Sequence, residues 1–135
     1  MNKYKLNPFD FNETVSLRRD LHKIPETAFL EIETSKYIVN YLNNLGIKFE
    51  DGIAGTGIIA ELKGLKESKR ANKIILLRAD MDGLPIKEET ELSFSSSNGS
   101  MHACGHDGHM AILMSVAKIL SQNLDIFSGT VKFIF

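Results

Sequence analysis

Apolar residues recur at helical spacing in three segments of the chain, which therefore predict three α-helices. Asp10 or Asn12 is expected to cap the first helix, because both side chains accept hydrogen bonds from the free N–H groups at a helix start. The second helix is expected over residues 29–45, ended by a left-handed Gly46, and the third over about residues 107–122. The apolar stripes of the first and second helices are Val15, Leu17 and Leu21, and Ile32, Ile38, Val39, Leu42 and Leu45.

Short apolar runs between these segments predict β-strands over residues 47–50, 57–62, 73–78 and 130–135. The run at 73–78 is continuous rather than alternating, which is typical of a strand covered on both faces. It is followed by a long stretch, residues 79–104, that is rich in Ser, Asn and Gly. Long irregular segments inside a domain usually have a function. The order of the elements predicts an α/β fold in which helices pack on a sheet.

Composition narrows the class of protein. The 135 residues carry a formal net charge of −1, so the chain lacks the excess of Lys and Arg that neutralises phosphates, and no nucleic-acid partner is expected. The longest apolar stretch, residues 111–120, is interrupted by Lys118 and is too short to span a membrane. The single cysteine cannot form an internal disulfide, and the N-terminus shows no signal-peptide pattern. A soluble, cytoplasmic protein with no membrane association is expected.

Three of the four histidines and the cysteine lie together between residues 101 and 109, in the run Met-His-Ala-Cys-Gly-His-Asp-Gly-His. Cys104 and His106, at a junction between loop and helix, can face one ion, and a thiolate with an imidazole suits zinc or a similar transition metal. Asp107 can add a ligand or orient a histidine ring. The helix start disfavours a cation but lowers the pKa of a neighbouring thiol. The cluster predicts a metal site or a catalytic site.

Two carboxylates, Asp80 and Asp82, directly follow the strand predicted at 73–78. Alone, such residues are more typical of a turn. Ligands of open α/β sheets bind at the carboxyl ends of the strands, however, so both aspartates are expected at one sheet edge with the Cys/His cluster. The segment from Arg18 to His22 can supply a binding residue, but it is interpreted first as a charged helix end. Glu88 and its acidic neighbours are interpreted as a solvated face.

The motifs occur in an order and spacing that resemble one family. They are Arg19-Asp20-Leu21-His22 with Pro25-Glu26, Gly55-Thr56-Gly57, the run from Leu77 to Ile86, the run from Met101 to His109, and Gly129-Thr130-Val131 before Phe133-Ile134-Phe135. From about Leu17 onward the chain resembles the N-terminal part of an M20 family metallopeptidase of the amidohydrolase branch. That branch contains N-acyl-amino-acid amidohydrolases, hippurate hydrolases and auxin-conjugate hydrolases.

The resemblance implies roles for single residues. Cys104 and His106 take the positions of metal ligands, and Asp82 matches an aspartate that helps to position a ligand in the catalytic site. Asp80 stands where other branches have a ligand histidine. The nearby His102 and His109 receive no role. Two divalent ions are implied, zinc or manganese first, with cobalt or nickel also compatible.

The resemblance also implies the domain organisation. Residues 1–135 correspond to the N-terminal portion of a layered α/β catalytic domain, with a mixed sheet flanked by helices. In the family the strand equivalent to 133–135 runs into a Gln-Pro-Ala-Glu-Glu motif, whose glutamates supply the general base and a metal ligand. That motif, the further histidine ligands and an inserted dimerisation domain are absent from this sequence. A homodimer is expected for the full-length parent.

The implied reaction is hydrolysis of the amide bond of an N-acyl amino acid, or a similar small conjugate, by metal-activated water. The 135-residue chain is expected to be inactive alone, because the general base is missing. One alternative is a non-catalytic fragment or interaction module that associates through an exposed C-terminal strand, residues 130–135. A second alternative makes Cys104 a nucleophile activated by His106 or His102.

Overall fold

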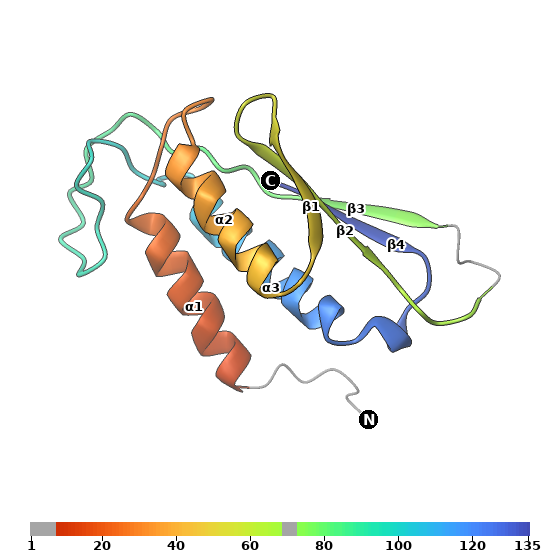
Figure 1. The fold of residues 1–135 in the computed structure, drawn as a ribbon. Coiled ribbons are helices and arrows are strands. Elements are labelled where there is room, and N and C mark those ends of the chain that lie inside the picture. The colour runs from red at the N-terminus through yellow and green to blue at the C-terminus, as the bar shows by residue number, and fades with distance from the viewer. Residues whose placement is uncertain (1–7, 69–72) are drawn as a thin grey trace.

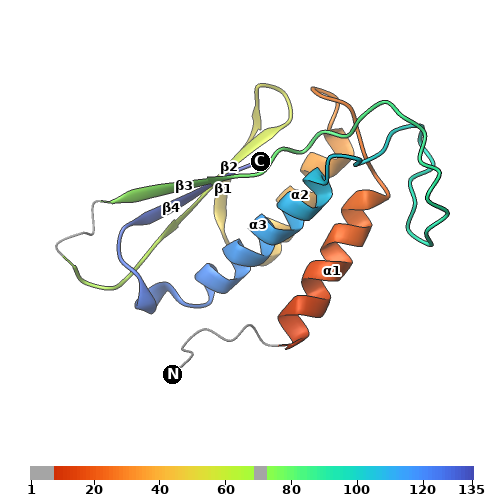
Figure 2. The same cartoon turned by 180° about the vertical axis from the view of Figure 1, so that it is seen from behind.

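The computed structural model describes residues 8–68 and 73–135, which form a mixed sheet with helices against one of its faces (Figure 1). Within these residues the elements are α1 (Pro8–His22), α2 (Ile32–Asn44), β1 (Lys48–Ile53), β2 (Gly57–Lys63), β3 (Ile74–Arg78), α3 (His106–Ser121), a 3₁₀ turn (Leu124–Ile126) and β4 (Thr130–Ile134). Helices α2 and α3 contact the sheet, and α1 packs along α3 (Figure 2). The predicted α/β class is confirmed. No helix in the described ranges is long and apolar enough to cross a membrane.

The starts of the first two helices differ from the prediction. Helix α1 begins at Pro8, so Asp10 and Asn12 lie inside it rather than at its cap. Proline is favoured in the first turn of a helix, because the N–H that it lacks has no intrahelical partner there. Helix α2 begins at Ile32, because Phe29 adopts a left-handed conformation with φ of 67° that no helix can include. Ile32 is exposed and does not belong to the apolar stripe.

The strand order is β1-β2-β4-β3 within the described residues. Strand β2 pairs antiparallel with both β1 and β4, whereas β3 pairs parallel with β4. Phe133 of β4 lies opposite Ala60 of β2 and is fully buried. A large side chain beside a small one lets the facing helices approach the sheet closely. The other buried residues on this face of β2 and β4 are Ile58, Leu62 and Val131.

Two predictions about exposed strands are wrong. Strand β3 is an edge strand of the described sheet and is not covered on both faces: Ile74, Ile75 and Leu76 are 64%, 58% and 55% exposed. The C-terminal strand β4 lies between β2 and β3 and is therefore not an exposed edge. An interaction module that pairs through β4 is excluded by this order, because both sides of β4 already carry strand partners.

The long irregular segment after β3 is present as predicted, and its ends are held together. Leu84 and Met101 form a β-bridge with two N–H···O bonds of 2.9 Å. The N–H of Gly83 donates to the carbonyl of Glu26 at 2.6 Å, which ties the segment to the turn after α1. These bonds bring both ends of the segment to the start of α3, where the candidate site lies.

The central place of β4 predicts a large effect of truncating Phe133. The Phe133→Ala variant should lose about 3–5 kcal/mol of unfolding free energy, because a wholly buried aromatic ring leaves a cavity that the sheet and helices cannot close. Urea denaturation followed by circular dichroism measures the loss. Phe11→Ala, at an exposed ring on α1, should change stability by less than about 1 kcal/mol. Equal effects of the two variants would contradict this position of β4.

Candidate metal centre

Asp82 and His106 lie together where the segment after β3 meets the first residue of α3. Nδ1 of His106 is 2.9 Å from the carboxylate Oδ1 of Asp82 and 2.9 Å from the backbone carbonyl oxygen of the same residue. Both oxygens are acceptors, so Nδ1 must carry the hydrogen. In the neutral ring the lone pair then lies on Nε2. This is the arrangement of a metal-binding histidine whose other nitrogen donates to a carboxylate.

Cys104 lies two residues before His106 and is exposed with a free thiol. Gly105 between them has φ of 80°, a left-handed conformation that sets the turn into α3. Among the described residues the thiol makes no hydrogen bond to a histidine ring, so the structure gives no base that would activate Cys104 as a nucleophile. The geometry therefore gives no support to the alternative in which Cys104 is a nucleophile.

Cys104 and His106 are suitable ligand types for a metal ion, but they are too few to form a site by themselves. A thiolate and an imidazole nitrogen suit zinc, and protein sites use at least three ligands. In the part of the chain that the structure describes, no cluster of three or more His, Cys, Asp or Glu side chains is arranged to hold an ion. Cys104 and His106 alone therefore do not make a complete metal site within the described residues.

Asp80 is placed differently from Asp82. It forms an ion pair with Arg78, the last residue of β3, and does not contact the Cys/His cluster through any hydrogen bond in the described residues. Both aspartates line a cleft of about 370 Å³ at the carboxyl ends of β3 and β4, which Phe135 and Phe29 also line. The expected position at this sheet edge is thus confirmed for both, and only Asp82 reaches a histidine.

Behind this site, His22 of α1 forms a buried network with two carboxylates. Its Nδ1 is 2.7 Å from Oδ2 of Asp107, and its Nε2 is 3.0 Å from Oε1 of Glu88. Nη2 of Arg18 also lies 3.3 Å from Nδ1 of His22. His22 does lie in the last turn of α1, a charged helix end as predicted, but it is buried there together with Asp107 and Glu88.

Glu88 was expected on a solvated face, but its side chain is completely enclosed. Burial alone would raise the pKa of Glu88, yet hydrogen bonds from the Thr90 hydroxyl, the Ser96 N–H and His22 outweigh it and lower the pKa to about 2. No local pattern around Glu88 signals this burial. Its partners come from a loop turn and from a helix 66 residues earlier.

Arg18 joins the network and fastens the loop around Phe94. Its Nε is 2.7 Å from Oδ2 of Asp107, and its guanidinium lies 5.3 Å from the centre of the Phe94 ring. The guanidinium of Arg19 lies 5.1 Å from the same ring. Cations this close to an aromatic face are attracted by the ring electrons. The segment carrying Glu88 and Phe94 is thereby held to α1 at two points.

The two other histidines of the cluster lie in contrasting surroundings. His102 is buried, and neither ring nitrogen makes a well-formed hydrogen bond among the described residues. Burial lowers the pKa of His102, and the neighbouring His22 adds to the lowering while Asp107 opposes it. His109 is exposed one turn along α3, with its ring centre 5.8 Å from that of His106.

Comparisons with known proteins point to one family. A family model described as peptidase family M20/M25/M40 matches residues 76–135. The N-acetylcysteine deacetylase of Bacillus subtilis is 45% identical over 123 residues, which cover 90% of this chain and 31% of the relative. The N-acyl-L-amino acid amidohydrolase of Geobacillus stearothermophilus is 40% identical over 124 residues, covering 91% of this chain and 32% of that protein.

A solved structure is similar over nearly the whole chain. The YXEP protein of Bacillus subtilis, described as a dinuclear metal binding peptidase from the M20 family, superposes with a TM-score of 0.87 at 42% identity. The match covers 96% of this chain and 36% of that protein. The chain therefore spans about a third of the length of the proteins that it matches.

The low pKa of Glu88 predicts a pH dependence of stability. A carboxyl whose pKa falls from 4.5 in the unfolded chain to about 2 in the fold stabilises the fold fully above pH 4.5. This stabilisation, about 3 kcal/mol at most, is lost as the pH falls toward 2. The Glu88→Gln variant should be less stable at pH 7 by about 1–3 kcal/mol and should lack this part of the acid dependence.

Urea denaturation midpoints at a series of pH values between 2 and 7 test this expectation. Glu89→Gln, an exposed neighbour on the same loop, is the matched control and should follow the parent curve. A Glu88→Gln variant as stable as the control at pH 7 would show that the buried network adds nothing.

Proposed function

We propose that this chain is the N-terminal part of an M20 family peptidase or amidohydrolase. We propose further that it supplies part of a metal-dependent hydrolytic site. The substrate class is the amide bond of N-acyl amino acids or similar small conjugates, as the names of two relatives suggest for those proteins. The observation that carries the proposal is the contact of His106 Nδ1 with two oxygens of Asp82, its carboxylate Oδ1 and its backbone carbonyl oxygen. Cys104, two residues earlier in the sequence, has an exposed thiol.

The residues that would hold metal are Cys104, through its thiolate, and His106, through Nε2. The thiolate favours zinc, and manganese, cobalt or nickel are compatible with the imidazole and with carboxylates from elsewhere. Two divalent ions are proposed for the complete site, in line with the dinuclear description of the YXEP protein. A bound ion supplies Lewis-acid activation of water and of the amide carbonyl.

Asp82 is a positioning residue in this proposal. By accepting the Nδ1 hydrogen, its carboxylate fixes the tautomer and the ring orientation of His106 and makes Nε2 a stronger donor to metal. Nδ1 of His106 also lies 2.9 Å from the backbone carbonyl oxygen of Asp82. The adjacent cleft at the carboxyl ends of β3 and β4 offers space for a small acyl conjugate.

Residues 1–135 are proposed to be the N-terminal portion of the catalytic domain, with the general-base glutamate and the further ligands contributed from beyond it. This follows from the resemblance and from the share of the relatives that the chain spans, about a third. A cytoplasmic location and a homodimer of the full-length protein belong to the same proposal.

Zinc binding tests the assigned ligands. Titration of the chain with Zn²⁺ in a calorimeter should show one weak site that Cys104→Ser or His106→Ala removes. Asp82→Asn should weaken binding by about 10–100-fold, the usual effect of losing a carboxylate that supports a ligand histidine. Asp80→Asn, whose partner is Arg78, should bind within about threefold of the parent. Equal weakening by both asparagine variants would refute the role of Asp82.

Activity measurements test whether the site is incomplete. With Mn²⁺ or Zn²⁺ added, the purified 135-residue chain should hydrolyse N-acetylated amino acids no faster than buffer, because a general base is missing. Full-length N-acetylcysteine deacetylase of Bacillus subtilis serves as the positive control. Turnover by the chain that Cys104→Ser abolishes would show instead that these residues form a working site.

A further inference from the structure

Near the end of the long segment between β3 and α3, Asn98 is followed by Gly99. This is the only Asn-Gly pair in the sequence, and both residues are exposed. The side-chain amide of an asparagine is open to attack by the backbone nitrogen of the next residue. The attack is fastest when that residue is glycine, because no side chain hinders the approach. Sequence and exposure therefore both favour spontaneous deamidation at this pair.

The structure holds the Asn98 side chain in a turn with its own backbone. Its Oδ1 accepts a hydrogen bond from the N–H of Ser100 at 3.1 Å, which closes the turn around Gly99. That hydrogen bond draws electrons from the amide carbon and stabilises the negative charge that Oδ1 acquires during an attack. Gly99 has φ of 85°, a conformation that glycine adopts without strain. The turn thus activates the amide at the peptide that would attack it.

The nitrogen of the same amide connects the loop to the turn after α1. Nδ2 of Asn98 donates to the carbonyl oxygen of Pro25 at 2.7 Å, across 73 positions of the sequence. The next carbonyl, that of Glu26, accepts the N–H of Gly83 at 2.6 Å. The turn therefore holds the long segment near both of its ends. Loss of the Asn98 amide would remove the attachment on the side that leads into the Cys/His cluster.

We propose that Asn98 is a deamidation site and that its modification releases this end of the loop from Pro25. The nitrogen of Gly99 loses its proton and bonds to Cγ of Asn98, while the bond from Cγ to Nδ2 breaks. Ammonia leaves with that proton, and a five-membered succinimide remains. Water then opens the ring at one carbonyl carbon or the other, which gives aspartate or isoaspartate.

Both products change the attachment and the charge of the loop. A carboxylate takes the place of the Asn98 amide, and it has no hydrogen to donate to the Pro25 carbonyl. It also adds a negative charge to a loop that already carries Glu89 and Glu91. The reaction needs neither metal nor substrate, and because ammonia is lost it is not reversed in the fold.

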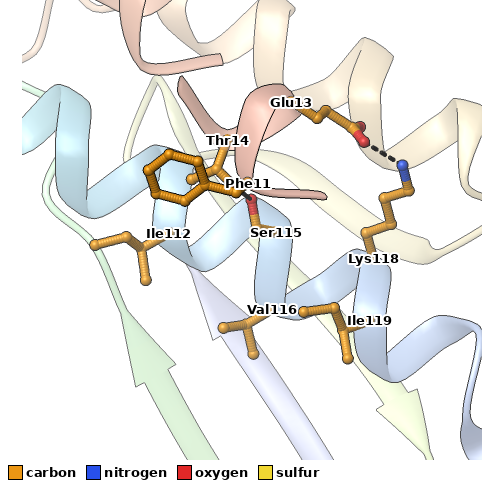
Figure 3. A pocket seen from close by; sticks show the side chains of 8 residues that line it. All are labelled: Phe11, Glu13, Thr14, Ile112, Ser115, Val116, Lys118 and Ile119. Atoms are coloured by element: carbon orange, nitrogen blue, oxygen red, sulfur yellow. Dashed lines mark hydrogen bonds and ion pairs between the residues drawn. The ribbon is translucent and has the colours of Figure 1, made fainter. Parts of the chain in front are cut away.

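The packing of α1 on α3 does not depend on this loop. Figure 3 shows Thr14 of α1 beside Ser115 of α3, with their hydroxyl oxygens 2.6 Å apart, and the ion pair between Glu13 and Lys118. These contacts hold the first half of α1 when the bond to Pro25 is lost. The release is therefore expected to be confined to the loop, with the two helices unchanged.

Ageing of the purified chain at neutral pH, in water enriched in heavy oxygen, tests the reaction. Peptide mapping by mass spectrometry follows each asparagine. Asn123 is the matched control, because its Nδ2 also donates to a backbone carbonyl at 2.7 Å, that of Ile119, but Leu124 follows it. Asn98 should convert at least tenfold faster than Asn123, with heavy oxygen incorporated and isoaspartate among the products. Conversion no faster than that of Asn123 would overturn the proposal, as would aspartate alone, which indicates direct hydrolysis.

Hydrogen exchange tests the release. In the Asn98→Asp variant, which carries one product from the start, the amide hydrogens of Leu84 and Met101 should exchange severalfold faster than in the parent, because their β-bridge lies close to the lost attachment. Ser97→Asp adds the same charge at the exposed neighbour and keeps the Asn98 amide, so it should exchange like the parent. Amide hydrogens of α1 and α3 should not change in either variant. Parent-like exchange in Asn98→Asp, or faster exchange throughout the helices, would contradict a local release.

Discussion

The buried contact between His22 and Asp107 determines how the parts around the candidate metal centre are placed. One imidazole connects the end of α1, the first turn of α3 and, through Glu88, the loop between β3 and α3. Charged groups in an interior are stable only when each has a partner, because separating them leaves a buried charge without compensation. The network therefore links the three segments, and Arg18 contacts both Asp107 and Phe94 at its edge.

The geometry of the candidate metal centre depends on this network. Asp107 is fixed by His22, and His106 precedes it at the start of α3, so the imidazole ring is presented at one angle to Asp82. The segment bearing Asp82 is held independently, by the bond from Gly83 to the turn after α1. His106 and Asp82 are thus aligned by two separate contacts near the C-terminal end of α1, one through His22 and one through the turn that follows the helix. Asp82 also lines the cleft at the carboxyl ends of β3 and β4, so the aligned pair lies at the edge of that cleft.

Periodicity and local chemistry predicted most of the fold. The spacing of apolar residues predicts α3 within a residue of its observed bounds. The two aspartates after the strand predict the correct sheet edge. What the sequence could not supply were facts that depend on distant partners. Glu88 is buried only because His22 folds over it, and nothing in its own neighbourhood distinguishes it from Glu89. The continuous apolar run at β3 predicts a strand that is covered on both faces, but its side chains are exposed. An apolar sequence shows that a strand needs covering elements, and it does not show whether those elements are present.

The central position of β4 also bears on the order of events during synthesis. Strands β1, β2 and β3 leave the ribosome first, but β2 and β3 have no contact in the sheet until β4 is inserted between them. Its residues, Thr130–Ile134, are among the last of this sequence to be translated. The β1–β2 hairpin and the helices can form early, whereas β3 must wait as an unpaired apolar segment. The nascent chain thus passes through a stage in which the apolar strand β3 is complete but β4, its neighbour in the described sheet, is not yet made.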